Sequence, residues 1–327
     1  MQNSPLIKIS HLSKHFNLEA GFFARNRKTV YAVNDVSFSI ERGKTYGIVG
    51  ESGCGKTTTA RMLIQMYRQS GGEILYFPKT DESESPAEPL NVERFGRKEL
   101  KLYREKVKYV FQDPARSLNP RMSVFDVLIS GLKYSSMWQG KDNARILCEK
   151  IIQEVGLSPE DLNRRPAEFS GGQRQRISIA RGLIMNPELL ICDEVVSALD
   201  VSIQGQIINL LLDLREKRNL SYLFITHDLK VACYFCDTIG VMYRGVLVEE
   251  APAADLYSEA LHPYTKLLFE GSRNLVSASS LEVKTTLEKE NCCPFAYRCP
   301  KATERCRSAL PEFTEVSESH KVRCFEL

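Results

Sequence analysis

The sequence lacks long hydrophobic runs and an excess of charge of either sign. No stretch of the 327 residues approaches about 18 uninterrupted apolar residues, so we expect no membrane-spanning helix. The segment 1–16 has no apolar core followed by a cleavage site, which argues against a signal peptide and favours a cytoplasmic protein. The 44 Lys and Arg residues nearly balance the 41 Asp and Glu residues. Charge therefore gives no argument for nucleic acid or a membrane surface as partner.

The composition is that of a folded protein with more than one domain. Apolar residues make up 43% and charged residues 26%, which excludes disordered, collagen-like and coiled-coil proteins. A chain of this length predicts about two domains, and it contains no internal repeat. Short apolar runs alternate with turns and helical patterns, at residues 44–49, 109–111, 189–193 and 222–226. This alternation predicts an α/β fold with a largely parallel sheet and helices on both faces.

The pattern also suggests where domains begin and end. Residues 123–186 are mainly helical and indicate a subdomain set into the strand order. After about residue 257 the pattern weakens, and 271–290, which is rich in Ser, Thr and charge, is typical of a linker. We therefore predict a main domain over 1–270 and a cysteine-rich tail over 291–327.

A glycine-rich loop carries the clearest chemistry. The segment 50–57 matches the pattern G-x-x-x-x-G-K-S/T, directly after a predicted strand and before a predicted helix. Glycines let the backbone fold around phosphate oxygens, and the helix that follows directs its positive end at them. Lys56 would reach the β- and γ-phosphates, and the Thr57 hydroxyl would bind Mg²⁺. The candidate ATP-binding residues of this loop are Gly50, Glu51, Ser52, Gly53, Cys54, Gly55, Lys56, Thr57 and Thr58.

Two acids end a later apolar strand, at Asp193 and Glu194. Asp193 would hold Mg²⁺ through its water shell, and Glu194 could polarise the attacking water. Solvated acids at a strand end would be the better interpretation if they stood alone. A phosphate loop in the same sheet reverses that preference.

Further motifs make the chain resemble the ATPases of ABC transporters. Residues 169–173 (FSGGQ) resemble the LSGGQ signature of that family, with Phe in place of Leu. Gln112 is similar to the Q-loop glutamine, residues 197–200 (SALD) to the D-loop, and His227 to the switch histidine. The resemblance covers roughly residues 6–270. Ser170 is also a good helix N-cap, and the two glycines after it expose the amides of a helix start.

The resemblance implies a RecA-like parallel-sheet core, an antiparallel β subdomain, a helical signature subdomain and a small cysteine-rich tail. It also implies a head-to-tail dimer with ATP at the interface. Glu194, His227 and Gln112 would be catalytic, and Thr57, Gln112 and Asp193 would hold Mg²⁺. The residues that would serve the partner's ATP are Ser170, Gly171, Gly172, Gln173 and Asp200.

An aromatic side chain upstream would stack on adenine. By its position Phe16 fits best, and Tyr31 and Phe22 remain possible. Aromatic residues near a strand more often belong to a core.

Three strings narrow the resemblance to peptide and nickel uptake ATPases, namely residues 111–122, 197–204 and 261–265. The phosphate loop and the strand before Asp193 are most similar to the F-type subunit of oligopeptide and dipeptide permeases. Such a subunit would pair with a related D-type ATPase beneath two membrane permeases, which receive solute from an extracytoplasmic binding protein. The helical face around the Q-loop would receive the permease. The chain would then lie peripherally at the cytoplasmic face of the cell membrane.

Two positions depart from the family pattern. Val195 stands where Pro is usual, and Ala167 stands where His is common. Neither removes a catalytic group, so we expect this subunit's own ATP site to be competent.

Half of the ten cysteines lie in the last 36 residues. Four clustered thiolates suit a [4Fe–4S] cluster or zinc. The resemblance favours iron–sulfur, and it implies the ligands Cys293, Cys299, Cys306 and Cys324. Cys292 would be a spare, although it could exchange with Cys293. The pair Cys233 and Cys236 has no second pair nearby, so buried thiols are the better interpretation.

Other functions fit less well. A nickel or metal-chelate importer is the main alternative solute class. An ABC ATPase of DNA repair would need a long insertion between the nucleotide motifs, and 50–227 leaves no room for one. A ribosome-associated factor would need two cassettes, and an exporter half would carry membrane helices. The basic stretch 94–108 is interleaved with acids and is typical of a solvated helix face, so we expect no nucleic acid.

Overall fold

The computed structural model describes residues 5–18, 28–79, 88–271 and 292–327. These residues divide into two compact units. The first, which we call the signature unit, comprises residues 41–44 and 94–225. The second, which we call the phosphate-loop unit, comprises the described residues of 5–40, 45–93 and 226–327. The predicted linker 271–290 lies almost wholly outside the described residues.

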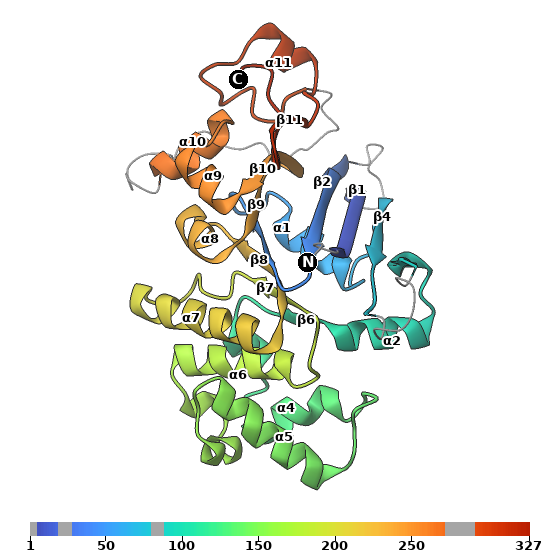
Figure 1. The fold of residues 1–327 in the computed structure, drawn as a ribbon, viewed down its shortest axis with the longest axis vertical. Coiled ribbons are helices and arrows are strands. Elements are labelled where there is room, and N and C mark those ends of the chain that lie inside the picture. Colours follow the sequence, from blue (N-terminus) through green and yellow to red (C-terminus); the bar gives the residue numbers. More distant parts are fainter. Residues whose placement is uncertain (1–4, 19–27, 80–87, 272–291) are drawn as a thin grey trace. The chain divides into compact units, whose positions relative to one another are not determined.

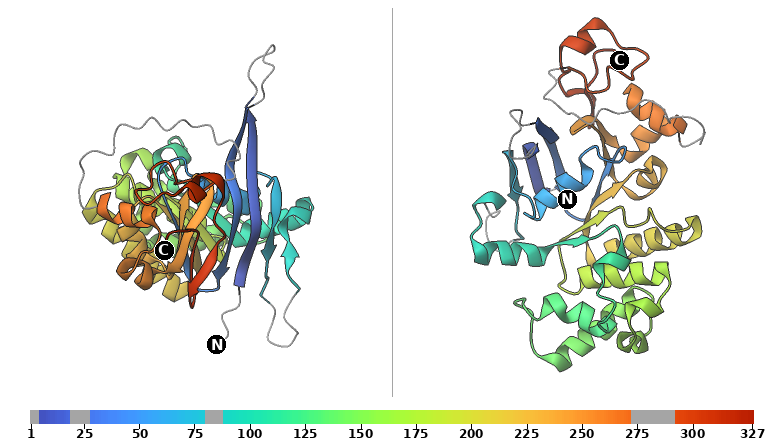
Figure 2. Two further views of the ribbon diagram at one scale, coloured as in Figure 1. Left: turned by 90° about the horizontal axis from the view of Figure 1, so that it is seen from above. Right: turned by 180° about the vertical axis from the view of Figure 1, so that it is seen from behind.

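The phosphate-loop unit contains an antiparallel sheet in the strand order β2-β1-β4-β5. Its strands are β1 (Pro5–Leu18), β2 (Lys28–Glu41), β4 (Gly71–Tyr76) and β5 (Leu90–Asn91). The two long strands run side by side (Figure 2). Both extend beyond the short strands that the sequence predicts at residues 6–9 and 30–40. A 3₁₀ turn, η1 (Val92–Arg94), follows β5.

A second sheet in this unit joins the phosphate loop to the C-terminal tail. β3 (Thr45–Val49) runs parallel to β9 (Thr238–Tyr243), and β10 (Val246–Pro252) is antiparallel to β9. The tail then adds β12 (His320–Val322) and β11 (Thr314–Ser317), both antiparallel (Figure 1). The tail is therefore part of the sheet, which the sequence pattern did not predict.

Short helices complete this unit: α1 (Lys56–Leu63), α8 (Leu229–Phe235), α9 (Ala253–Ser258), α10 (Pro263–Gly271) and α11 (Glu304–Ser308). Because α1 ends at Leu63, it is shorter than the helix to residue 67 that the sequence predicted. Helix α10 lies in the region beyond residue 257 where the sequence pattern weakened, and α9 ends where that region begins.

The signature unit is built on three parallel strands. β7 (Leu189–Asp193) pairs with β6 (Val107–Val110) on one side and β8 (Ser221–Thr226) on the other. Every residue of β7 and β8 is buried, so both read as continuous apolar runs. The prediction of a parallel sheet in an α/β fold is confirmed.

Helices make up the rest of the signature unit, and several begin at residues suited to cap them. Asp113 accepts hydrogen bonds from two backbone amides at the start of α3, and Ser123 accepts one at the start of α4. The helices are α2 (Arg97–Lys106), α3 (Pro114–Ser117), α4 (Val124–Leu132), α5 (Lys141–Glu154), α6 (Gly171–Leu183) and α7 (Val201–Arg218), with 3₁₀ turns η2 (Pro159–Asn163) and η3 (Pro166–Glu168).

Candidate functional site

The phosphate loop connects β3 to α1 and depends on glycine at a critical point. Gly55 has φ +110°, and a Cβ there would lie 2.3 Å from the carbonyl oxygen of Ala32. No other residue fits without moving the backbone. Lys56 is buried, and its ammonium donates to the carbonyl oxygens of Gly50, at 2.7 Å, and Glu51, at 2.9 Å. The loop thus holds its own cation at the start of α1.

The remaining loop residues divide between exposed and buried positions. Ser52 and Gly53 are exposed, Thr57 and Thr58 are half-buried, and Cys54 is buried. Burial raises the pKa of the Cys54 thiol above its ordinary value, although Lys56 opposes the shift. Cys54 therefore acts as a small apolar side chain beneath the loop.

His227 follows β8 and directly precedes the helix α8. Its side chain is exposed. Asp228 caps α8 by accepting hydrogen bonds from the amides of Lys230, at 2.9 Å, and Val231, at 3.2 Å. This cap fixes the backbone next to His227.

The aromatic candidates for adenine lie on β1 and β2. The Phe16 ring is half-buried, lies edge-on to Tyr67 at 5.6 Å between centroids, and has the Lys14 ammonium 5.0 Å from its centre. Tyr31 contacts the ring of His15 at 5.7 Å. Phe22 lies outside the described residues.

The two predicted carboxylates lie at the end of β7, each held by a side chain from the β6 region. Asp193 is buried, and the Tyr109 hydroxyl donates a hydrogen bond to its carboxylate. The Gln112 amide donates to the Glu194 carboxylate at 2.8 Å. Because β6 runs parallel to β7, both partners come from the same edge of the sheet. The predicted grouping of Gln112 with the two acids is thus present in this unit.

The backbone at Glu194 has a left-handed conformation, with φ +48°. Few residues other than glycine adopt it, and such positions cluster at functional sites. The turn is held because the Ser197 amide and hydroxyl both donate to the Glu194 carbonyl oxygen, at 3.2 and 2.9 Å. Val195, where the family pattern has Pro, is buried in this turn. Asp200 ends the segment, exposed at the start of α7.

The signature segment forms the start of α6 as a reciprocal capping box. The Ser170 hydroxyl accepts from the Gln173 amide at 3.3 Å, and the Gln173 side chain accepts from the Ser170 amide at 3.0 Å. Ser170 is exposed. A Cβ at Gly172 would lie 2.7 Å from a methyl group of Ile203, so α6 packs closely on α7 there. The helix start therefore presents its amides next to the D-loop.

The structure gathers the predicted residues in two groups, one in each unit. The phosphate-loop unit holds the whole loop, His227 and Phe16. The signature unit holds Gln112, the two carboxylates, the signature segment and Asp200. A phosphate loop after one buried parallel strand and a carboxylate pair after another are what phosphoryl transfer from a nucleotide requires.

Comparison with known proteins agrees with this arrangement. The ABC transporter family matches residues 33–197. The chain is 42% identical to the oligopeptide transport ATP-binding protein AppF of Bacillus subtilis (strain 168) over 98% of this chain and 96% of that protein. OppF of the same organism shows the same identity and the same coverage. This chain belongs to the ABC transporter ATP-binding proteins. The resemblance seen in the sequence is confirmed.

Two further comparisons refine the description of this ABC transporter ATPase. Residues 248–306 match the family described as oligopeptide/dipeptide transporter, C-terminal region. A dimeric ATP-binding cassette solved in a post-hydrolysis state with ADP and phosphate aligns with a TM-score of 0.62 at 25% identity, over 76% of this chain and 98% of that one. The predicted cassette fold is therefore confirmed. In the described part of the ATPase, no helix combines the length and apolarity needed to cross a bilayer.

The tail cysteines lie close to one another in this ATPase. Cys299, Cys306 and Cys324 all act electrostatically on Cys293, whose pKa is raised to about 11 mainly by burial. None of the ten cysteines, all of which are described, is in a disulfide. However, the described residues contain no group of three or more His, Cys, Asp or Glu side chains arranged as metal ligands. The predicted [4Fe–4S] cluster is therefore not supported by this geometry.

The other cysteine pair, Cys233 and Cys236, was interpreted from the sequence as buried thiols. Cys236 is buried and Cys233 is half-buried on and after α8. Burial raises the pKa of Cys233 to about 11, so it remains a thiol at neutral pH.

Sequence reasoning missed two side chains that contact the phosphate loop. The Glu51 amide donates to the Tyr264 hydroxyl at 2.9 Å, and the Arg298 guanidinium pairs with the Glu51 carboxylate. Both come from the C-terminal region. The string 261–265 pointed to a subfamily but carried no signal of this contact.

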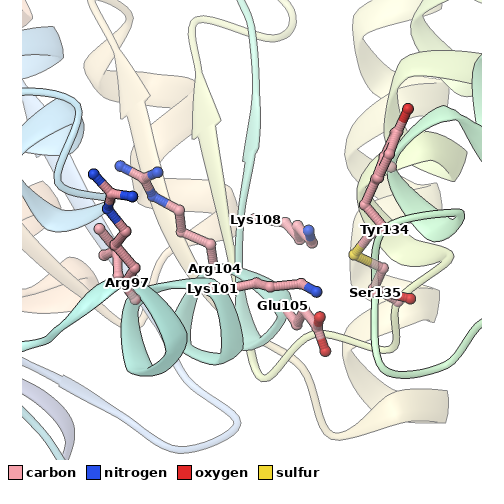
Figure 3. A pocket seen from close by; sticks show the side chains of 10 residues that line it. Arg97, Lys101, Arg104, Glu105, Lys108, Tyr134 and Ser135 are labelled. Atoms are coloured by element: carbon pink, nitrogen blue, oxygen red, sulfur yellow. The ribbon is translucent and has the colours of Figure 1, made fainter.

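Sequence reasoning also missed a pocket in the signature unit. It has a volume of about 470 Å³ and is lined by α2, β6 and the end of α4. Lys101 and Lys108 extend toward Tyr134 and Ser135 (Figure 3). Burial lowers the pKa of Lys108. The basic stretch does form the expected helix, α2, whose basic side chains are exposed, and some of them, such as Lys101, also line the pocket.

Proposed function

We propose that this ATPase powers the uptake of oligopeptides or dipeptides through a membrane permease. The observation that carries the proposal is the combination, in one chain, of both nucleotide motif groups with the oligopeptide/dipeptide C-terminal region. The relatives that match over almost their whole length carry oligopeptide transport in their names.

Within that function, the side chains have distinct roles. Lys56 binds the β- and γ-phosphates, and Thr57, Gln112 and Asp193 hold Mg²⁺, which neutralises charge on the phosphates. Glu194 orients and polarises the attacking water, and the hydrogen bond from Gln112 sets the direction of its carboxylate. His227 contacts the γ-phosphate, and Phe16 stacks on adenine.

The ATPase works as a head-to-tail dimer. The start of α6 is exposed at Ser170, and a helix start offers its backbone amides to an anion, which supports a role toward a partner's ATP. Asp200 lies exposed at the start of α7, and the next residue, Val201, is 84% exposed. An apolar side chain at that position is suited to an interface. The partner is a related D-type subunit.

The basic pocket of the signature unit contributes to the surface that contacts the permeases. Its strand, β6, leads to Gln112, which lies four positions after the pocket residue Lys108, so a change at the pocket is connected to the catalytic group through the chain. Tyr134 at the rim is 77% exposed. A Tyr134→Cys variant should cross-link to a cysteine on the cytoplasmic face of a permease, whereas Ile146→Cys on α5, also exposed, should not. Equal cross-linking at both sites would reject the assignment.

We also propose that the four tail thiols bind a metal group, with a [4Fe–4S] cluster as the form that the family resemblance implies. Support comes from the fold of the tail, in which the Cys293 amide donates to the Cys306 carbonyl oxygen at 2.9 Å, and from the thiol side chains, which suit iron or zinc. Binding would need to draw the thiols closer than they lie here. Iron and acid-labile sulfide should be present after anaerobic purification and lost in Cys299→Ser. Zinc, or no metal, would reject the cluster.

A growth experiment tests the transport function. A strain that lacks this chain should fail to use oligopeptides or dipeptides as its only source of a required amino acid, and the free amino acid should restore growth. Nickel-dependent growth should be unaffected. Loss of nickel-dependent growth with normal peptide use would instead establish the nickel importer.

A further inference from the structure

The second residue of the phosphate loop, Glu51, is held by the C-terminal region at two points. Its amide donates to the Tyr264 hydroxyl at 2.9 Å. Its carboxylate receives two hydrogen bonds from the Arg298 guanidinium, at 2.9 and 3.0 Å. This bidentate geometry is the strongest that Arg and a carboxylate form. All three residues belong to the phosphate-loop unit.

Arg298 is placed by a compact aromatic cluster. Phe295 is 1% exposed and lies edge-on to Tyr243, with 5.3 Å between ring centroids. It also contacts the rings of Tyr264, at 5.4 Å, and His262, at 5.8 Å. The Arg298 amide donates to the Phe295 carbonyl oxygen at 2.9 Å. The side chain that reaches Glu51 is thus fixed by its own backbone and by the ring beneath it.

The backbone around Phe295 and Arg298 is fixed by a turn over residues 293–306, which we call the cysteine turn. The Cys293 amide donates to the Cys306 carbonyl oxygen at 2.9 Å, and the Cys299 amide donates to that of Phe295 at 3.0 Å. Phe295 and Arg298 lie between these cysteines. Their positions therefore depend on how the tail is folded.

The contact with Arg298 matters because the Glu51 carboxylate carries a negative charge inside a loop proposed to bind phosphates. A carboxylate in a loop that binds a triphosphate repels the ligand, and over several ångströms near a protein surface one unit charge changes affinity severalfold. Arg298 neutralises this charge, and its guanidinium also donates to the Tyr243 hydroxyl, at 3.4 Å.

We propose that Arg298 is a positioning residue of the ATP site, which acts through Glu51 by cancelling its charge and fixing its side chain, so that the folded cysteine tail sets the affinity of this subunit for nucleoside triphosphate. The inference rests on the proposed role of the phosphate loop as the nucleotide site. It assigns to the C-terminal region a function inside the nucleotide-binding machinery.

The test measures the dissociation constant of a fluorescent ATP analogue on the full chain. Arg298→Gln should weaken binding about three- to tenfold, because it leaves Glu51 charged and unpaired. A second substitution, Glu51→Gln, should restore binding to within about twofold in the double variant. Arg298→Lys should bind almost as the wild type does. The defect of Arg298→Gln should shrink in 0.5 M salt, about the range where screening is strong.

A matched control comes from the same tail. Arg305 lies on α11, and its guanidinium covers the Phe325 ring at 4.2 Å from the centre. Arg305→Gln therefore removes the same charge from the tail as Arg298→Gln does. It should leave ATP affinity unchanged. If Arg298→Gln also binds normally, or if the double variant stays as weak as Arg298→Gln alone, the proposal is wrong. Lys56→Ala separates this proposal from the proposed nucleotide site itself. Loss of binding in Lys56→Ala supports the nucleotide site at the phosphate loop, whatever the result for Arg298→Gln.

Discussion

The phosphate loop and the carboxylate turn both follow a buried parallel strand, but they are stabilised differently. Glu194 and Asp193 are held by side chains from the neighbouring strand region, Gln112 and Tyr109, less than 90 residues away. Glu51 in the phosphate loop is held by Tyr264 and Arg298, more than 200 residues away in the chain. The chemistry of one group is thus fixed locally, and that of the other depends on the C-terminal region.

This difference teaches where control over the ATPase can be exerted. The hydrogen bond between Gln112 and Glu194 joins the ends of two neighbouring strands, so a displacement of β6 would change it. The contacts on Glu51 respond instead to the tail and to α10. The proposed roles of the two groups then predict that the first set of contacts affects hydrolysis and the second affects nucleotide affinity.

The largest expected effect comes from the carboxylate turn. Glu194→Gln keeps the hydrogen-bonding shape but removes the base, so ATP hydrolysis in the assembled complex should slow by about 10²–10⁴. ATP binding should remain intact, since Glu194 belongs to the hydrolytic group. Turnover and nucleotide binding are measured on the same preparation. Near-normal turnover would remove Glu194 from its role.

The next effect concerns the stability of the segment that contains His262 and Tyr264, which contacts the phosphate loop. Burial lowers the pKa of His262 to about 4, and its Nδ1 accepts a hydrogen bond from the Tyr264 amide at 3.0 Å. The unfolded state, with an ordinary pKa near 6.5, binds a proton first as pH falls. The contribution of His262 to the free energy of unfolding is thus fully present above about pH 6.5. It decreases by about 3 kcal/mol as the pH falls to about 4.

Thermal melting at pH 7.5 and pH 5 measures this loss against a matched variant. His262→Asn offers a side-chain oxygen in place of Nδ1 but does not titrate. The melting temperature of the wild type should fall more between the two pH values than that of His262→Asn. Parallel falls would show that His262 is not the responsible group.

A smaller effect should follow from loss of the hydrogen bond on Asp193. Tyr109→Phe removes only the hydroxyl that donates to this buried carboxylate. A hydrogen bond to a charged group contributes about 1.5–3 kcal/mol. At about 1.4 kcal/mol for each tenfold in rate, hydrolysis should slow about 10- to 150-fold. The control is Tyr222→Phe, whose hydroxyl donates to the Leu211 carbonyl oxygen at 3.0 Å. It should reduce stability without changing turnover, and equal turnover defects would contradict a local role for Tyr109.

The smallest effect is expected at the second cysteine pair. Cys233→Ser should change the free energy of unfolding by less than about 0.5 kcal/mol, because the side chain is only half-buried. Metal content should be the same as in the wild type. A loss of metal in this variant would show that the pair, and not the tail alone, binds it.

The sequence predicted the elements whose signal is local. The loop 50–57, the strand that ends at Asp193 and the helix N-cap at Ser170 are each complete within a few residues, and each was located correctly. The contact between Arg298 and Glu51 was not predictable, because it joins residues 247 positions apart and neither belongs to a recognised pair pattern. For the same reason the pairing of β12 with β10 was missed.

The cysteine tail shows a different limit. The family resemblance implied four metal ligands, but neither a resemblance nor the spacing of cysteines determines how far apart the folded side chains lie. The structure shows instead that Cys293, Cys299 and Cys306 shape a turn whose backbone hydrogen bonds fix Phe295. The turn therefore has a structural role with or without a metal group.

The most direct test of the central claim is ATP turnover by the assembled transporter in lipid vesicles, with and without an oligopeptide and its binding protein. The account predicts that the peptide stimulates turnover and is taken up, and that Glu194→Gln in this subunit abolishes or greatly reduces both. A rate that is the same with and without peptide, or stimulation only by a nickel chelate, would contradict the account.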